Sequence, residues 1–102
     1  MNSVEENIML YKGASIFRNI RRKDGAEWTS DDTATYLVRN MKDDTKVTEG
    51  MLSKSADSLQ FNLRFTDTDA WIPKNKYLLL VWIENTVTGY SQPVLEMTIT
   101  VK

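Results

Sequence analysis

The residue types that most often carry out chemistry in proteins are missing from this chain. Its 102 residues include no histidine and no cysteine. A Ser-His-Asp triad needs an imidazole, and most zinc sites need imidazole or thiolate ligands, so both are excluded. No pair of carboxylates has the arrangement expected of a glycosidase, and no glycine-rich phosphate loop is present. We therefore predict no enzyme activity, and we assign no catalytic, cofactor-binding or metal-binding residue.

A basic cluster is the first group of residues that could bind something. It consists of Arg18, Arg21, Arg22 and Lys23, followed by Asp24 at a turn. Such a cluster could hold phosphate or an acidic partner, or it could be the solvated end of a β-hairpin. The chain as a whole has a net charge of −1, from 13 basic and 14 acidic residues, which gives no bulk attraction for nucleic acid. We therefore do not expect nucleic acid as a partner.

Acidic residues form the second group. They are Asp31, Asp32, Asp43, Asp44, Asp57, Asp67 and Asp69. A calcium ion needs about six to eight oxygen ligands that converge from loops, and no segment here has the spacing of a calcium-binding hand. Aspartate is also common in turns and at helix starts, where its side chain accepts backbone hydrogen bonds. The sequence therefore predicts turn residues and no cofactor.

Aromatic residues outside strands form the third group. Trp28 and Trp71 fall in expected loops, and Tyr90 falls in the last turn. Aromatic side chains on loops can anchor a partner, or they can cap the ends of a core. We expect Trp71 in the core because Ile72 and Pro73 follow it. Both interpretations stay open for Trp28 and Tyr90.

The positions of these groups depend on the strands around them. The apolar run from Tyr77 to Ile83 is too short to span a membrane, which takes about 20 apolar residues. A turn-rich stretch follows, and then apolar and polar residues alternate from Leu95 to Val101, as in a strand with one wet face. The two segments predict a hairpin whose first strand is apolar on both faces.

Further strands are indicated by β-branched residues, alternation and turn signals between them. They are Asn7 to Tyr11, Ala14 to Arg21, Thr33 to Asn40, Lys46 to Leu52 and Ser58 to Phe65. The segment from Thr66 to Pro73 could form one helical turn. About seven short strands without a long helix predict an all-β fold, an antiparallel β-sandwich. We expect residues 1–6 to be a loose tail and residues 7–102 to be a single domain.

The order of these signals resembles a known family. The stretches that carry the likeness are Lys12-Gly13 before a strand, Asp24-Gly25 at a turn, the polar loop 30–33, the strand from Tyr36 to Arg39, and Tyr77 at the start of the penultimate strand. This pattern resembles small immunoglobulin-like domains of tailed-phage virion proteins, and is similar to the N-terminal domain of phage baseplate upper proteins. Ala14 and Asn75 depart from it, since that family usually has an acidic residue and a glycine there.

The resemblance implies an immunoglobulin-like sandwich and a noncatalytic role as a structural subunit or adaptor of a phage particle, in its baseplate, tail or head-tail region. Its partners would be other virion proteins and the chain itself, with no membrane. The protein would be made in the host cytoplasm and carried in the virion. The alternative is a small cytosolic binding module that docks on another protein or inhibits it.

An assembly surface is predicted around the expected edge strand from Lys46 to Leu52, because unpaired strand edges are pairing sites. The candidate interface residues are Trp28, Met41, Met51, Leu52 and Tyr90. The competing interpretation is that Met41, Met51 and Leu52 cover the edge of the core.

Overall fold

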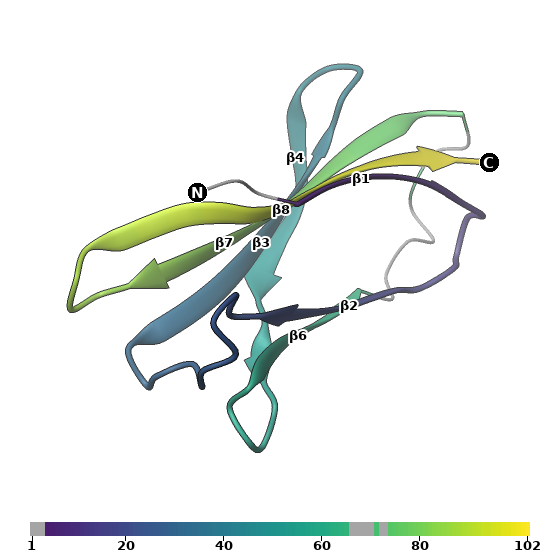
Figure 1. Cartoon of the computed structure of the whole chain (residues 1–102). Coiled ribbons are helices and arrows are strands. Elements are labelled where there is room, and N and C mark those ends of the chain that lie inside the picture. The colour runs from purple at the N-terminus through teal and green to yellow at the C-terminus, as the bar shows by residue number, and fades with distance from the viewer. Residues whose placement is uncertain (1–3, 66–70, 72–73) are drawn as a thin grey trace.

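The structure is a computed structural model, and it describes residues 4–65, 71 and 74–102. These residues form eight strands in two sheets that face each other (Figure 1). The strands are β1 (Val4–Leu10), β2 (Ile16–Arg21), β3 (Asp32–Asn40), β4 (Thr45–Met51), β5 (Ser53–Lys54), β6 (Gln60–Phe65), β7 (Lys76–Asn85) and β8 (Tyr90–Val101). The helical turn predicted for residues 66–73 falls almost wholly outside the described residues.

The larger sheet has the order β1-β8-β7-β3-β4. The predicted hairpin is present as β7 and β8, an antiparallel pair with Leu79 opposite Met97 and one irregularity between Val81 and Trp82. β7 lies at the centre of the sheet, in line with its apolar sequence. The expected edge strand is also present, since β4 is the last strand on its side.

The first strand differs from the expectation in two ways. β1 begins at Val4, so residues 4–6 belong to the strand and not to a loose tail. β1 also runs parallel to β8, with Val4 beside Leu95, so the sandwich is not antiparallel throughout. The parallel pairing places Val4, Glu6, Ile8 and Leu10 on the inner face, because their partners in β8 face inward.

The smaller sheet has the order β2-β6-β5. The facing of β2, which the sequence left ambiguous, is now defined. Ile16 is buried and Ile20 packs against the core, whereas Phe17 is 52% exposed on the other face. Arg18 shares the inner side with the two isoleucines, which places a cation between the sheets.

The core fills the space between the sheets. Inward positions of β6 and β8 alternate as predicted, and β7 alternates between buried and half-buried residues. Leu63, Leu79 and Met97 are fully buried. Trp71 is also buried, with its ring stacked on Tyr77 at 4.6 Å between centroids, which confirms its predicted place in the core. The part of the chain that the structure describes has no helix long and apolar enough to cross a membrane.

Candidate functional site

A cleft opens between the two sheets at one end of the sandwich. It has a volume of about 730 Å³ and lies between β2 on one side and β1, β8 and the β7–β8 hairpin on the other. The cleft exists because β1 pairs with β8 in the larger sheet, which leaves β2 at the edge of the smaller one. The cleft brings together Trp28, Tyr90, Arg18, Arg21, Arg22 and Lys23.

Apolar side chains form the walls of the cleft. Ile83 and Leu95 are buried, and Ile20 and Val94 are half-buried and packed against the same core. The surface inside the cleft is therefore continuous with the hydrophobic core. Such a surface favours an apolar occupant, because burying it removes it from water.

Trp28 forms one wall of the cleft and is held there by the fold. Its indole N–H donates to the carbonyl oxygen of Ile20 at 3.1 Å, and its ring packs against Phe61 at 5.1 Å between centroids. Its backbone N–H donates to the carbonyl oxygen of Ser58 at 2.7 Å. Trp28 therefore caps the core, as one of the two predicted interpretations had it, and it also lines the cleft.

An ion pair joins the two sheets inside the cleft. The Arg18 guanidinium donates two hydrogen bonds to Oε2 of Glu6, from Nη2 at 2.9 Å and from Nε at 3.1 Å. Arg18 comes from β2 and Glu6 from β1, so the pair spans the sandwich. Both side chains are about one-third exposed, so solvent weakens the attraction. The pair serves mainly to fix the separation of β1 from β2.

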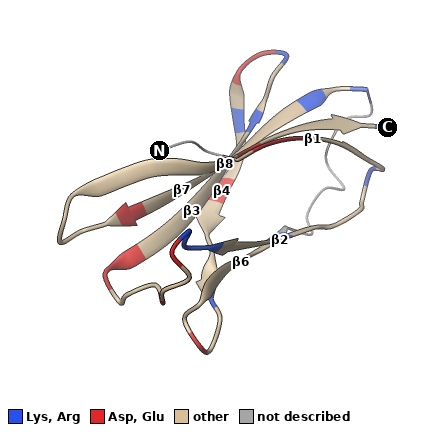
Figure 2. Ribbon diagram, in the orientation of Figure 1, with Lys and Arg blue, Asp and Glu red and all other residues tan. Residues whose placement is uncertain are grey.

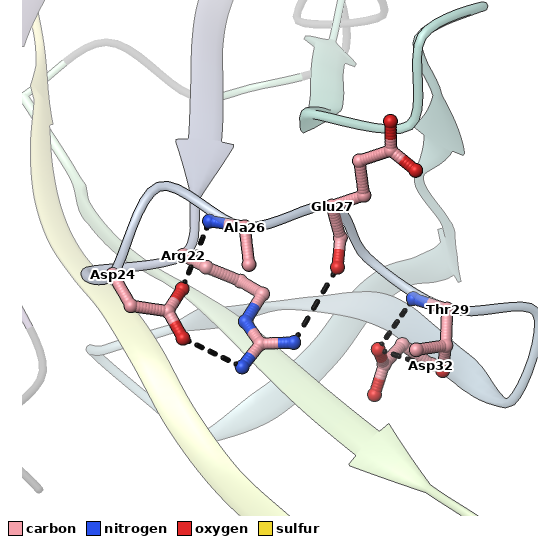
Figure 3. A network of polar contacts seen from close by, with 6 residues as sticks. All are labelled: Arg22, Asp24, Ala26, Glu27, Thr29 and Asp32. Carbon is pink, nitrogen blue, oxygen red and sulfur yellow. Dashed lines mark hydrogen bonds and ion pairs between the residues drawn. The ribbon is translucent and has the colours of Figure 1, made fainter.

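A second ion pair stabilises the loop after β2 (Figure 3). Arg22 Nη2 lies 2.8 Å from Asp24 Oδ2, and the backbone N–H of Ala26 donates to Asp24 Oδ1 at 3.0 Å. The Ala26 hydrogen bond and the Arg22 charge hold the pKa of Asp24 below its ordinary value. Gly25 has a φ of 74°, a left-handed conformation that suits glycine, so the tight turn predicted at Asp24-Gly25 is present.

Asp32 is the one charged side chain that is buried among the described residues. Its Oδ2 accepts hydrogen bonds from the backbone N–H of Thr29 at 2.8 Å and the Thr29 hydroxyl at 3.0 Å, and its Oδ1 accepts one from Asn85 Nδ2 at 2.8 Å. Burial acts to raise the pKa of Asp32, but the hydrogen bonds from Asn85 and Thr29 together lower it below the ordinary value. Asp32 therefore ties the loop before β3 to the end of β7.

Charge is concentrated on the rim of the cleft. Figure 2 shows the Lys and Arg colour at the end of β2 and the Asp and Glu colour in the adjoining loop. Arg18 and Arg22 are paired with carboxylates, while Arg21 and Lys23 are exposed and make no ion pair with the described residues. The described residues also contain no group of three or more metal-ligating side chains. A cleft with apolar walls and a cationic rim suits the binding of an apolar group that has acidic neighbours.

The remaining predicted interface residues lie elsewhere. Leu52 is only 7% exposed and belongs to the core, so its assignment to an interface was wrong. Met51 and Met41 are 69% and 48% exposed, but they do not lie side by side. Asn40 pairs with Thr45 at one end of β4 and Met51 lies at the other end, roughly 20 Å away at the usual rise per residue.

Met51 belongs to a second surface, on the outside of the larger sheet. Its partner in β3 is Thr35, which in turn pairs with Trp82 of β7. Several outward positions of β3 and β7 are also apolar, although Arg39, Glu49 and Glu96 lie among them on the same face. We call this set the outer surface; it consists of Leu37, Met51, Leu78, Leu80 and Trp82. Part of it, together with Thr35, Glu49 and Glu84, lines a shallow depression of about 540 Å³.

Most residues of the cleft were not predicted as site residues, among them Glu6, Asp32 and Val94. Glu6 was placed in a tail, Asp32 was interpreted as a turn residue, and Val94 precedes the segment whose alternation was used. A usable sequence signal did exist for Glu6, because Val4, Ile8 and Leu10 lie on one side of a period-two pattern and Glu6 falls on the same side. No sequence signal pointed to the hydrogen bond between Asp32 and Asn85, which are 53 residues apart.

Comparison with known proteins identifies the fold and nothing finer. No family model matches the chain, and no curated protein sequence matches it. Among solved structures, it is similar to a chain in the crystal structure of ICOS in complex with ICOS-L and an anti ICOS-L VNAR domain, with a TM-score of 0.54 and 15% identity. The match covers 98% of this chain and 56% of that one, so this chain spans little more than half of its neighbour's length. The fold is an immunoglobulin-like β-sandwich, as predicted.

The immunoglobulin pattern clarifies why the cleft exists. In constant-type domains the strands of one sheet are A, B, E and D, and those of the other are C, F and G. By order and pairing, β2, β6 and β5 correspond to B, E and D, while β7 and β8 correspond to F and G. β1 lies beside β8, so among the described residues the place of strand A next to β2 has no strand.

Proposed function

We propose that this chain is a noncatalytic domain that acts by protein–protein assembly, as a structural subunit or adaptor of a tailed-phage particle. The phage setting is supported by the sequence resemblance to virion immunoglobulin-like domains. In this proposal the partners are other virion proteins of the baseplate, tail or head-tail region and further copies of the chain, and the protein passes from the host cytoplasm into the virion. Assembly itself is supported by the outer surface.

The outer surface supports assembly because β7 is apolar at outward positions, where a soluble sheet is usually polar. β7 carries Leu78, Leu80 and Trp82 on its outward side, at the centre of the sheet. Antiparallel sheets with one wet face normally alternate between apolar and polar residues, as β8 does. The outward side chains of β7 are half-buried by their neighbours, so part of their apolar area remains open to a partner.

The edge of the same sheet is also accessible. β4 has no neighbour beyond it among the described residues, and its exposed Met51 extends the outer surface to the edge. The strand carries one exposed ion pair, Lys46 with Glu49 at 3.0 Å, which keeps the edge soluble without closing it. A partner that covers both the edge and the outer surface would bury the methionine and the tryptophan together.

The test compares the wild type with Met51→Lys by light scattering over a concentration series. We expect the average mass of the wild type to rise with concentration and that of Met51→Lys to rise less, because a lysine at the edge opposes burial. Val87→Lys is the matched control, since Val87 is 73% exposed in the β7–β8 turn, away from β4. A wild type that stays monomeric while Met51→Lys melts at a lower temperature would show that Met51 has only a core-covering role.

A binding module that docks on another protein is the second candidate, and the cleft favours it. A concave apolar site with a charged rim is the usual form of a specific binding site. The two candidates differ in stoichiometry. A module would form a defined complex with a single partner through the cleft, whereas a particle subunit would also associate with copies of itself.

A further inference from the structure

We propose that the place beside β2 receives an extended segment of a partner protein, in which apolar residues alternate with acidic ones, as an added strand. The inference rests on the proposed role in protein–protein assembly and names the chemistry of one partner segment. Three independent features of the cleft support it: the open edge of β2, the apolar walls and the cationic rim.

The open edge supplies the backbone groups for a new strand. β2 pairs along its six residues with β6 on one side, from Ile16 beside Phe65 to Arg21 beside Gln60. On the other side, the described residues provide no strand. Backbone N–H and C=O groups on an unpaired edge can bind an extended peptide by strand addition, which is a common form of peptide recognition.

The walls supply a site for alternate side chains of the added strand. Successive side chains of a strand point to opposite faces, so every second residue beside β2 would point between the sheets. There the inward side chains would contact Ile20, Val94 and Trp28. The volume of about 730 Å³ is within the range of ordinary ligand sites, about 300–1,000 Å³. The inward residues of the segment should therefore be apolar.

The charged rim determines which residue types suit the outward positions of the added strand. Arg21 is exposed at the end of β2, and Lys23 is exposed just beyond it. Arg18 and Arg22 hold carboxylates of this chain, so the charge left for a partner is mainly that of Arg21 and Lys23. Acidic residues at the outward positions of an added strand would complement these cations, and charge complementarity of this kind selects the partner.

The experiment adds a capped eight-residue peptide that alternates valine with glutamate, and follows the backbone amides of the full chain by NMR and hydrogen exchange. We expect saturable binding and slower exchange along Ile16–Arg21. The same peptide with lysine in place of glutamate should bind more weakly. Lack of saturable binding, equal binding of both peptides, or protection only at β4 or β5 would each overturn the proposal. Protection of β2 that grows with protein concentration without peptide would assign the place to a second copy and overturn it too.

Variants test the two sides of β2 separately. Val94→Lys places a cation inside the cleft and should abolish binding of the valine–glutamate peptide. Phe17→Ser is the uncharged control on the outer side of the same strand, and it should bind like the wild type. Melting curves establish that both variants are folded. Equal loss of binding in the two folded variants would contradict a site in the cleft.

Reversing the charges of Arg21 and Lys23 tests whether they select the peptide, because a purely structural role of these residues would not exchange the preference between the two peptides. The double variant Arg21→Glu, Lys23→Glu should bind the valine–glutamate peptide at least about fivefold more weakly, if each exposed pair contributes about 0.5 kcal/mol. It should bind the valine–lysine peptide more tightly than the wild type does. Unchanged affinities for both peptides would overturn the role of the rim. If the cleft fails these tests while Met51→Lys still reduces self-association, the proposed function stands without this inference.

Discussion

The cleft and the outer surface are both exposed to solvent, but they are constructed in different ways. Polar contacts of Glu6, Arg18, Asp32 and Trp28 hold the cleft in place, and its apolar walls are continuous with the core. The outer surface instead consists of side chains such as Met51 and Leu80 that project outward from the strands of the larger sheet. A change in the cleft should therefore alter folding stability, whereas a change on the outer surface should alter association alone.

The largest contrast is expected between Leu95 and Met51. Leu95 is buried at the inner end of the cleft, and Leu95→Ala should lower the free energy of unfolding by about 2–5 kcal/mol because it leaves a cavity. Met51→Ala should change it by less than about 0.5 kcal/mol, as for other exposed positions. Urea unfolding followed by circular dichroism measures both. Equal losses would mean that Met51 is part of the core.

A smaller effect, with a characteristic pH dependence, is expected at Asp32. Asp32→Asn should cost about 1–3 kcal/mol near neutral pH, because the hydrogen bonds from Thr29 and Asn85 lose their charged acceptor. The pKa of Asp32 is lower in the folded chain than the ordinary value of 3.8. Its stabilisation is therefore present above that value and is lost as pH falls through the folded pKa.

Unfolding free energies of the wild type and Asp32→Asn at a series of pH values test this point. The difference between them should be constant at neutral pH and should shrink in acid. A difference that stays the same down to the most acidic pH would show that the carboxylate charge of Asp32 does not contribute.

The smallest effect is expected for the ion pair between Glu6 and Arg18. Both side chains are about one-third exposed, so a double-mutant cycle with Glu6→Gln and Arg18→Gln should give a coupling of about 0.2–1 kcal/mol. A coupling above about 2 kcal/mol would mean that the pair is far better shielded from solvent than its exposure indicates.

Local sequence patterns predicted the elements of this fold better than they predicted its sites. The apolar run from Tyr77 to Ile83 and the alternation from Leu95 to Val101 determined the hairpin, because side-chain period and turn residues are local properties. The parallel pairing of β1 with β8 was not predictable in this way, since it joins residues about 90 positions apart. The same reason explains the misplacement of Glu6 and the missed partner of Asp32.

The interface residues show the same limit. Met51 and Leu52 are adjacent in sequence and equally apolar, yet Met51 is exposed and Leu52 is buried. Their difference follows from the end of β4, where the chain turns from one sheet towards the other and Leu52 N–H donates to the carbonyl oxygen of Ala34. Met41 was grouped with them by composition, but the hairpin of β3 and β4 places it at the far end of β4.

Hydrogen exchange of the backbone amides at low and high protein concentration tests assembly through the outer surface most directly. We expect a higher protein concentration to slow exchange in β4 and to leave β2 unchanged, and we expect Met51→Lys to remove the difference while Val87→Lys does not. Exchange that is independent of concentration throughout the chain, or slowed equally in the Met51→Lys variant, would rule out assembly through the outer surface.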